Sequence, residues 1–269
     1  MTRRSLLPLL AATFLGGFVA LPVVAVLVTA FSDGPAAFMA ALAAPAARDA
    51  FRLTVAIGAL VAVVNAVAGT LLAWVLARSR CFGRGLLDAL IDLPFAIPTL
   101  VTGLMLVILV GPQSDAGAWL EARGVRVLFT WVAIVIALLF VTLPIVVRAV
   151  LPVLEEIDLD QEDAAATLGA WPAFTFRRVI LPAILPAVFQ GALLTFARAL
   201  GEFGAVVIVA GNIPHRTLTA PVHVFGAVES GDLVGASAMS VVLIALSMSL
   251  MLITDRYRRA WLAPRTEGR

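Results

Sequence analysis

The sequence predicts an all-α membrane protein with about six transmembrane helices. Of its 269 residues, 62% are hydrophobic and only 13% are charged, and the mean hydropathy is +1.05. A soluble domain usually carries about 25% charged residues, because its surface must be solvated by water. A helix that spans a bilayer needs roughly 20 predominantly apolar residues, and six stretches of this chain are long enough. Together these observations indicate a helical bundle embedded in lipid.

The six apolar stretches are expected to be helices, because backbone amides in hydrocarbon must find their hydrogen-bond partners within the same segment. The short segments of alternating polarity that a transmembrane barrel needs are not visible. The first stretch follows Arg3 and Arg4 but is too long for a signal peptide, so we expect a retained helix. The predicted spans are residues 6–31, 53–77, 93–110, 131–151, 183–210 and 234–254.

The arginines are unevenly placed along this topology. If the N-terminus is cytoplasmic, 13 of the 19 arginines fall in cytoplasmic segments and one, Arg198, lies within a span. Cytoplasmic loops of membrane proteins carry such an excess of positive charge. Both termini are therefore predicted to be cytoplasmic, and the pI of about 9.4 needs no nucleic-acid partner. The five arginines left for the outer loops are Arg48, Arg52, Arg123, Arg126 and Arg216.

The residue types exclude several chemistries. The chain has no lysine, so it has neither a phosphate-binding loop of the Walker A type nor a Schiff-base nucleophile. A single cysteine, Cys81, forms no internal disulfide and no cysteine-based zinc site. His215 and His223 show no metal-ligand spacing. We expect no cofactor, no metal and no enzymatic activity, so any ATP must be hydrolysed by another chain.

The segment between the fourth and fifth spans, about residues 148–182, is the one unusual loop. It places six carboxylates in the nine residues from Glu155 to Asp163. A strong helix former follows and is closed by Gly169, a residue type at which helices commonly end. Pro172, after Trp171, suits the first turn of another helix. The pattern predicts a short helix, a sharp turn and a second short helix.

Three large apolar residues in this loop, Trp171, Phe174 and Phe176, allow two interpretations. A solvated, charged loop is the simpler one. A free loop gains nothing from large apolar side chains, however, and apolar residues flanked by charge more often mark a docking site.

The loop resembles the EAA loop of permeases from binding-protein-dependent ABC importers. That pattern is Glu-Ala-Ala-x3-Gly-x9-Ile-x-Leu-Pro, and this chain carries Asp163-Ala164-Ala165, then Gly169, then Val179-Ile180-Leu181-Pro182. Asp163 stands in the place of Glu and Val179 in the place of Ile. The resemblance implies the fold of a type I ABC importer permease and a coupling helix that docks on a cytoplasmic ABC ATPase dimer. It also implies a second permease subunit and a solute-binding protein.

We expect the contacts to the ATPase to come from this loop. The residues expected to couple are Glu162, Asp163, Ala164, Ala165, Gly169, Trp171, Phe174, Leu181 and Pro182. The expected division of the chain is an N-terminal helix and outer loop over residues 1–52, a permease domain over residues 53–259 with the coupling loop at residues 155–182, and a cytoplasmic tail over residues 260–269.

Other stretches resemble the sulfate/thiosulfate permeases, in particular their T-type subunit. Residues 82–99 are similar to the segment that enters the third span of those permeases, and residues 196–204 and 210–212 to their fifth span and its exit. Molybdate/tungstate permeases share much of both segments and stay an alternative. The sulfate resemblance favours a heterodimer with a homologous permease, whereas the molybdate alternative favours a homodimer.

Arg198 and Glu202 are four residues apart in the fifth predicted span, where they can pair on one helix face. Two interpretations are open. The pair is either neutralised and fixes helix packing or holds a gate, or Arg198 attracts an anionic substrate. We favour the neutralised pair. An ion-coupled secondary transporter is the alternative class, but one carboxylate beside an arginine makes a poor proton relay.

Three prolines lie within predicted spans: Pro94, Pro98 and Pro144. They either shape a hinge or the lining of the pathway, or are kinks that the helices tolerate. His215 and His223 belong to the loop between the last two predicted spans, which is either solvated or contacts a solute-binding protein.

Overall fold

A computed structural model describes residues 3–78 and 83–262 of the chain. Arg80, Cys81, Phe82 and residues 263–269 of the predicted tail lie outside the described residues. The described residues form helices joined by turns, which confirms the all-α prediction. The elements are α1 (Arg3–Leu15), η1 (Gly16–Ala20), α2 (Leu21–Ala30), α3 (Pro35–Ala43), α4 (Pro45–Arg78), α5 (Arg84–Ala96), α6 (Thr99–Val110), α7 (Asp115–Glu121), α8 (Trp131–Glu156), α9 (Leu159–Thr167), α10 (Pro172–Thr175), η2 (Phe176–Ile180), α11 (Leu181–Leu200), α12 (Gly204–Ala210), α13 (Ala220–Glu229) and α14 (Leu233–Leu262).

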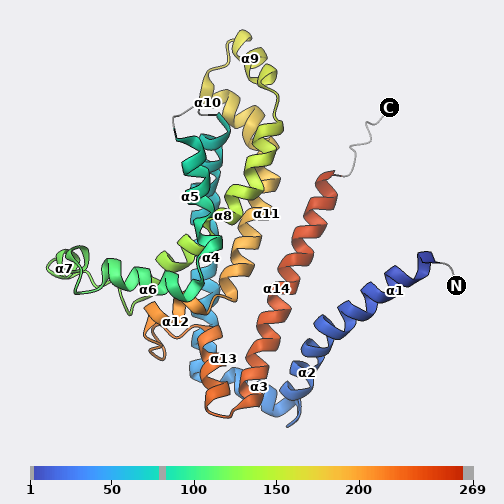
Figure 1. Cartoon of the computed structure of the whole chain (residues 1–269), viewed down its shortest axis with the longest axis vertical. Helices are drawn as coiled ribbons and strands as arrows, with labels where there is room; N and C mark the ends of the chain where they lie inside the picture. Colours follow the sequence, from blue (N-terminus) through green and yellow to red (C-terminus); the bar gives the residue numbers. More distant parts are fainter. Residues whose placement is uncertain (1–2, 79–82, 263–269) are drawn as a thin grey trace.

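Helices α4, α8 and α11 form the centre of the molecule and run side by side (Figure 1). Small residues let their backbones approach closely, as is typical of helices packed in membranes. A Cβ atom on Gly69 of α4 would lie 2.7 Å from Val146 Cβ of α8, and one on Gly191 of α11 would lie 3.0 Å from Val146 Cα. Asn65 of α4 adds a polar tie, because its side chain donates to Thr142 Oγ1 of α8 at 2.8 Å.

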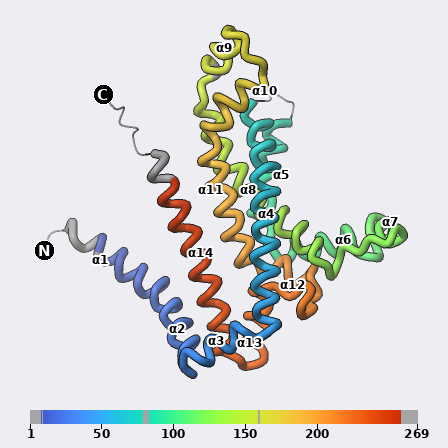
Figure 2. The backbone as a smooth tube through the Cα atoms, turned by 180° about the vertical axis from the view of Figure 1, so that it is seen from behind, coloured from blue at the N-terminus to red at the C-terminus, as the bar shows by residue number. Residues whose placement is uncertain are grey.

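Five helical segments are long and apolar enough to cross a membrane: Leu10–Ala30, Pro45–Arg78, Trp131–Glu156, Pro172–Leu200 and Leu233–Tyr257. The bent pair α5 and α6 makes a sixth if it is counted as one span. The N-terminal segment leans away from the bundle (Figure 2), and none of its apolar window is buried within this chain. Only α2 of this segment packs on the bundle, against α14, so most of its side chains are left to face lipid or another subunit.

The third predicted span is not one straight helix. Helices α5 and α6 meet at 111° across a break at Ile97 and Pro98. Ile97 is extended (φ −86°, ψ 127°), the conformation that a following proline imposes on its neighbour. Pro94 and Pro144, by contrast, lie inside the continuous helices α5 and α8. Of the three prolines considered, only Pro98 therefore stands at a break.

The fifth predicted span is also broken. Helix α11 ends at Leu200, and α12 begins at Gly204 after a short turn. At its N-terminal end, α11 follows α10 through the π-helical segment η2. The predicted second short helix is therefore the start of this span. Helices α12 and α6 pack closely, because Gly103 and Gly204 have no side chains to separate them, and a Cβ atom at either position would clash with the other helix. The segments that follow the two breaks, α6 and α12, thus lie against each other.

The end of the bundle opposite α9 is closed by α3, α13 and the start of α14 (Figure 1). Ala47 of α4, Ala220 of α13 and Met239 of α14 are all buried in one apolar cluster there. Thr54 Oγ1 of α4 accepts a hydrogen bond from Ala220 N at 2.8 Å, which joins α13 to the central bundle.

The close approach of α4 and α8 gives a first prediction. Gly69→Ala should lower the free energy of unfolding by about 1–3 kcal/mol, because Val146 leaves no space for a methyl group. Thermal unfolding of the purified protein in detergent measures this. Gly226→Ala in α13 is the matched control, because nothing lies within 4 Å of its Cβ position and it gains the same helix propensity. Equal melting temperatures for the two variants would contradict the packing described.

Candidate functional site

Helix α9 and the turn that follows it protrude beyond the bundle at one end (Figure 1). Asp158 caps α9 by accepting a hydrogen bond from Asp160 N at 3.1 Å, and Asp160 and Glu162 stand in its first turn, where carboxylates complement the helix dipole. Gly169 ends the helix with a φ of +83°, a left-handed conformation that glycine adopts without strain. The predicted helix and sharp turn are both present.

The tip of this protrusion is apolar and exposed. Leu168 is 89% exposed and Trp171 67% exposed, and Phe174 is exposed beside them. Trp171, Phe174 and Pro182 line a groove of about 780 Å³ together with Arg177 and Arg178. Burial of large apolar side chains is the main gain when proteins associate. An apolar tip bordered by arginines is therefore suited to docking on another protein.

The small residues of the EAA-like stretch lie on the same protrusion. Asp163, Ala164 and Gly169 are exposed, and Ala165 is half-buried. Leu181 is half-buried and begins α11, directly behind the groove. The structure thus brings the predicted coupling residues to one protruding end of the molecule, with one difference in orientation.

Glu162 is that difference, because its side chain faces the bundle. Its Oε1 lies 2.7 Å from Arg78 Nη2 at the end of α4, and both side chains are largely buried. Nearby, the rings of Trp74 and Phe176 meet edge to face with centroids 5.3 Å apart. Glu162 and Phe176 therefore connect α9 and η2 to the end of α4 by one ion pair and one aromatic contact.

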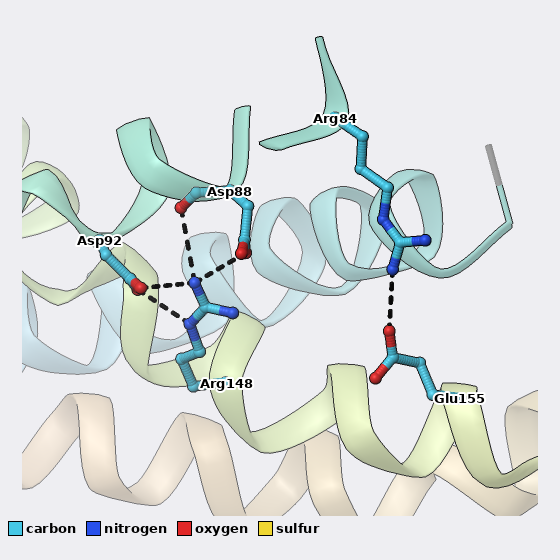
Figure 3. Close-up of polar contacts among 5 residues, drawn as sticks. All are labelled: Arg84, Asp88, Asp92, Arg148 and Glu155. Atoms are coloured by element: carbon cyan, nitrogen blue, oxygen red, sulfur yellow. Dashed lines mark hydrogen bonds and ion pairs between the residues drawn. The ribbon is translucent and has the colours of Figure 1, made fainter. Parts of the chain in front are cut away.

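A second set of charges joins α5 to α8 (Figure 3). Arg148 of α8 contacts Asp92 at 2.8 Å through Nε and at 2.5 Å through Nη2, and its Nη2 also lies 2.7 Å from Asp88 Oδ1. Arg84 and Glu155 pair at 2.9 Å closer to the protruding end. Since α8 runs almost directly into α9, these contacts link α5 to the same protrusion.

Sequence reasoning missed this cluster. It assigned Arg148 to a loop, and Asp88 and Asp92 only to a stretch of resemblance. A usable signal was present, because two aspartates four residues apart in an apolar segment lie on one helix face and require a cation. The charged cluster between α5 and α8, whose side chains are 34–46% exposed, is thus larger than the predicted Arg198–Glu202 pair.

Arg198 and Glu202 do pair, at 2.7 Å, but they do not share one helix. Arg198 is in the last turn of α11, and Glu202 lies in the turn before α12. Glu202 is only 2% exposed and also accepts a hydrogen bond from Ala205 N at 3.0 Å, whereas Arg198 is 43% exposed. The Glu202 carboxylate thus stabilises the break in the span, and the Arg198 guanidinium lies at the surface of the molecule.

The two histidines have different surroundings. His215 is exposed, and its Nδ1 lies 2.7 Å from Asp49 Oδ2 at the start of α4. His223 is half-buried in α13, where burial lowers the pKa of its imidazole below the usual 6.5. Only His215 thus lies in an exposed loop.

The fold and these charges define a polytopic helical membrane protein with an exposed apolar tip at the α9 end. The chain matches the family described as binding-protein-dependent transport system inner membrane component over residues 65–267. It is 42% identical over 232 residues to the probable sulfate transport system permease protein cysT of Nephroselmis olivacea, covering 86% of this chain and 82% of that one. It is 43% identical over 202 residues to the sulfate transport system permease protein CysT of Escherichia coli (strain K12), covering 75% and 73%.

This chain therefore belongs to the family of binding-protein-dependent inner membrane transport components. Solved structures share its fold. A bacterial ABC transporter involved in the import of the acidic polysaccharide alginate matches with a TM-score of 0.76 at 16% identity over 94% of both chains. The MetNI methionine ABC transporter matches with a TM-score of 0.58 at 17% identity, covering 77% of this chain and 92% of that one. The chain is a multi-pass membrane permease, a transporter component and not a catalytic enzyme.

The Arg148 cluster gives a second prediction. Arg148→Gln leaves two neighbouring carboxylates without a cation, so it should destabilise the protein by about 1–2 kcal/mol. Adding Asp88→Asn and Asp92→Asn should restore most of this loss. The control is Arg84→Gln, because Arg84 pairs with one carboxylate, Glu155, rather than two, so its loss should cost less than about 0.5 kcal/mol. Thermal unfolding in detergent compares the variants, and an Arg148→Gln effect no larger than that of Arg84→Gln would argue against the cluster.

Proposed function

We propose that this chain is the permease subunit of an ATP-driven importer for sulfate or thiosulfate. The observation that carries the proposal is the α9–α10 protrusion, an exposed apolar tip that is connected to the end of a lipid-embedded helical bundle. Family membership and the identity of more than 40% to sulfate permeases support it. Reconstituted vesicles test the substrate: uptake of radiolabelled sulfate should need ATP and the cognate binding protein and should exceed uptake of molybdate.

The α9 end is the cytoplasmic end in this proposal, with both termini on the same side. Arg78, Arg84, Arg177 and Arg178 gather at this end, as the positive-inside rule requires. The Trp171 groove and the Ala164–Gly169 stretch dock on an ABC ATPase dimer. A solute-binding protein delivers substrate at the opposite end, and a homologous permease completes the pathway as the second half of a heterodimer.

Coupling proceeds through the contacts described. Closure of the ATPase dimer displaces α9, and the Glu162–Arg78 pair carries the displacement into α4. Helix α8 follows through its short link to α9 and moves α5 through Arg148. The break at Pro98 lets α5 tilt while α6 keeps its contact with α12. Domain and helix shifts of this kind are an established way to switch between two states.

Trp171→Ala tests the docking element. Removing a large apolar anchor from an interface typically costs 2 kcal/mol or more, so the affinity for the ATPase subunit should fall roughly 30-fold, and ATP-driven uptake with it. Trp119→Ala on α7 is the control, because Trp119 is similarly exposed but lies on a different part of the molecule. Titration of the solubilised permease with its ATPase measures the affinity. Unchanged affinity for Trp171→Ala would remove this surface from the mechanism.

The Arg198–Glu202 pair is tested by charge-neutralising variants. Arg198→Gln should abolish most uptake, because it leaves a buried carboxylate without its cation. Glu202→Gln keeps an acceptor for Ala205 N, so the double variant should recover uptake in the same vesicle assay. A double variant as inactive as Arg198→Gln alone would instead assign Arg198 to contact with the anion.

A further inference from the structure

Three arginines toward the end of the molecule opposite α9 form no ion pair with the acidic side chains that the structure describes, although Arg52 lies near Asp49. Arg52 lies on α4, Arg126 in the loop before α8, and Arg216 in the loop between α12 and α13. Within the described residues, none of the three has a carboxylate at ion-pair distance. The nearby Asp49 is engaged by His215 at 2.7 Å and by Arg48 at 3.9 Å. The group therefore keeps its positive charge.

Arg216 lies between two adjoining grooves. One groove, of about 280 Å³, is lined by Asp49, Arg52, His215 and Arg216, and the other, of about 570 Å³, by Arg126, Thr130 and Arg216. Arginines from three separate segments of the chain thus line two grooves that share Arg216, and the one carboxylate among the lining residues, Asp49, is paired with His215. Concave sites with a few converging polar groups are typical of small ligands, whereas protein partners cover larger surfaces.

The loops that carry these groups are tightly held. Among the described residues, the non-glycine residues with positive φ are Phe129, Asn212 and His215, and all three lie in these two loops. Such conformations persist only where the surroundings impose them, and they gather at functional sites. Thr217 is buried and secures the second loop, because its hydroxyl donates to Ala210 O at 2.5 Å and accepts from Ile213 N at 3.1 Å.

The position fits the far side of a bilayer. Arg78 lies 26 positions after Arg52 in α4, a distance of about 39 Å at about 1.5 Å per residue, more than the roughly 30 Å of a hydrocarbon core. Arginines there run against the positive-inside rule, so a specific use is the better explanation for their grouping.

We propose that Arg52, Arg126 and Arg216 form a binding site for a tetrahedral oxyanion dianion at the outer mouth of the permease, where the ion is received before it enters the bundle. Guanidinium groups bind such oxygens through paired N–H donors. The inference rests on the proposed function and names the first residues of this chain that the substrate meets.

The test uses the complete transporter in vesicles of zwitterionic lipid, with radiolabelled sulfate as the probe. Uptake is measured against the concentration of sulfate-loaded binding protein for Arg216→Gln, Arg52→Gln, Arg216→Lys and the control Arg123→Gln. Arg123 shares this side of the molecule but stacks on Trp119 at 3.6 Å, outside both grooves. The maximal rate should fall about tenfold for Arg216→Gln and Arg52→Gln, because each loses a charge-assisted contact. Arg216→Lys keeps the charge but loses the paired N–H donors, so its rate should lie between those of wild type and Arg216→Gln.

The half-saturating concentration of binding protein should stay unchanged in these variants. If it rises while the maximal rate is kept, the arginines dock carboxylates of the binding protein, and the oxyanion site is wrong. If the maximal uptake rates of the variants equal that of the wild type, the arginines are only solvated, and the oxyanion site is also wrong. Failure of the wild-type transporter to take up sulfate with ATP would instead refute the proposed function, so the two failures are distinguishable.

Discussion

The hydrogen-bonding demand of backbone groups in hydrocarbon is the constraint on which this structure depends. It forces long helices, and it allows a break only where the freed backbone groups are covered by protein. Residues 3–78 and 83–262 contain two such breaks, at Ile97–Pro98 and after Leu200, and the segments beyond them, α6 and α12, pack on each other. Glu202 occupies the second break and accepts the amide of Ala205. Each break is thus stabilised by groups of the other broken span or by a buried carboxylate.

Charge placement follows from the same constraint. Charged side chains in a membrane protein are costly unless they are paired or reach water, and here they are grouped by function. Arg78–Glu162 and Arg148 with its two aspartates tie helices together near the protruding end. At the opposite end, Arg52, Arg126 and Arg216 stay unpaired in the described part of the chain. The proposed coupling therefore uses the paired charges, and the proposed oxyanion site uses the unpaired ones.

Long apolar runs made much of the fold predictable from sequence, and the spans around α4, α8 and α14 were found because nothing interrupts them. The turn at Gly169 was found because glycine and Trp171-Pro172 give local signals. The second break was missed, because the run continues to Ala210 at high hydropathy and only Gly201 and Gly204 hint at it. The inward orientation of Glu162 and the grouping of Arg52 with Arg216 depend on contacts between distant segments, which no local pattern records.

The central claim is that the α9–α10 protrusion docks on a cytoplasmic ATPase. A photo-crosslinking amino acid placed at Leu168, the most exposed apolar residue of the tip, tests it directly in native membranes. The account predicts a crosslink to the ATPase subunit, and no reaction of a cysteine at the same position with a membrane-impermeant maleimide added from outside. Labelling from the outside, or a crosslink to the solute-binding protein, would contradict it.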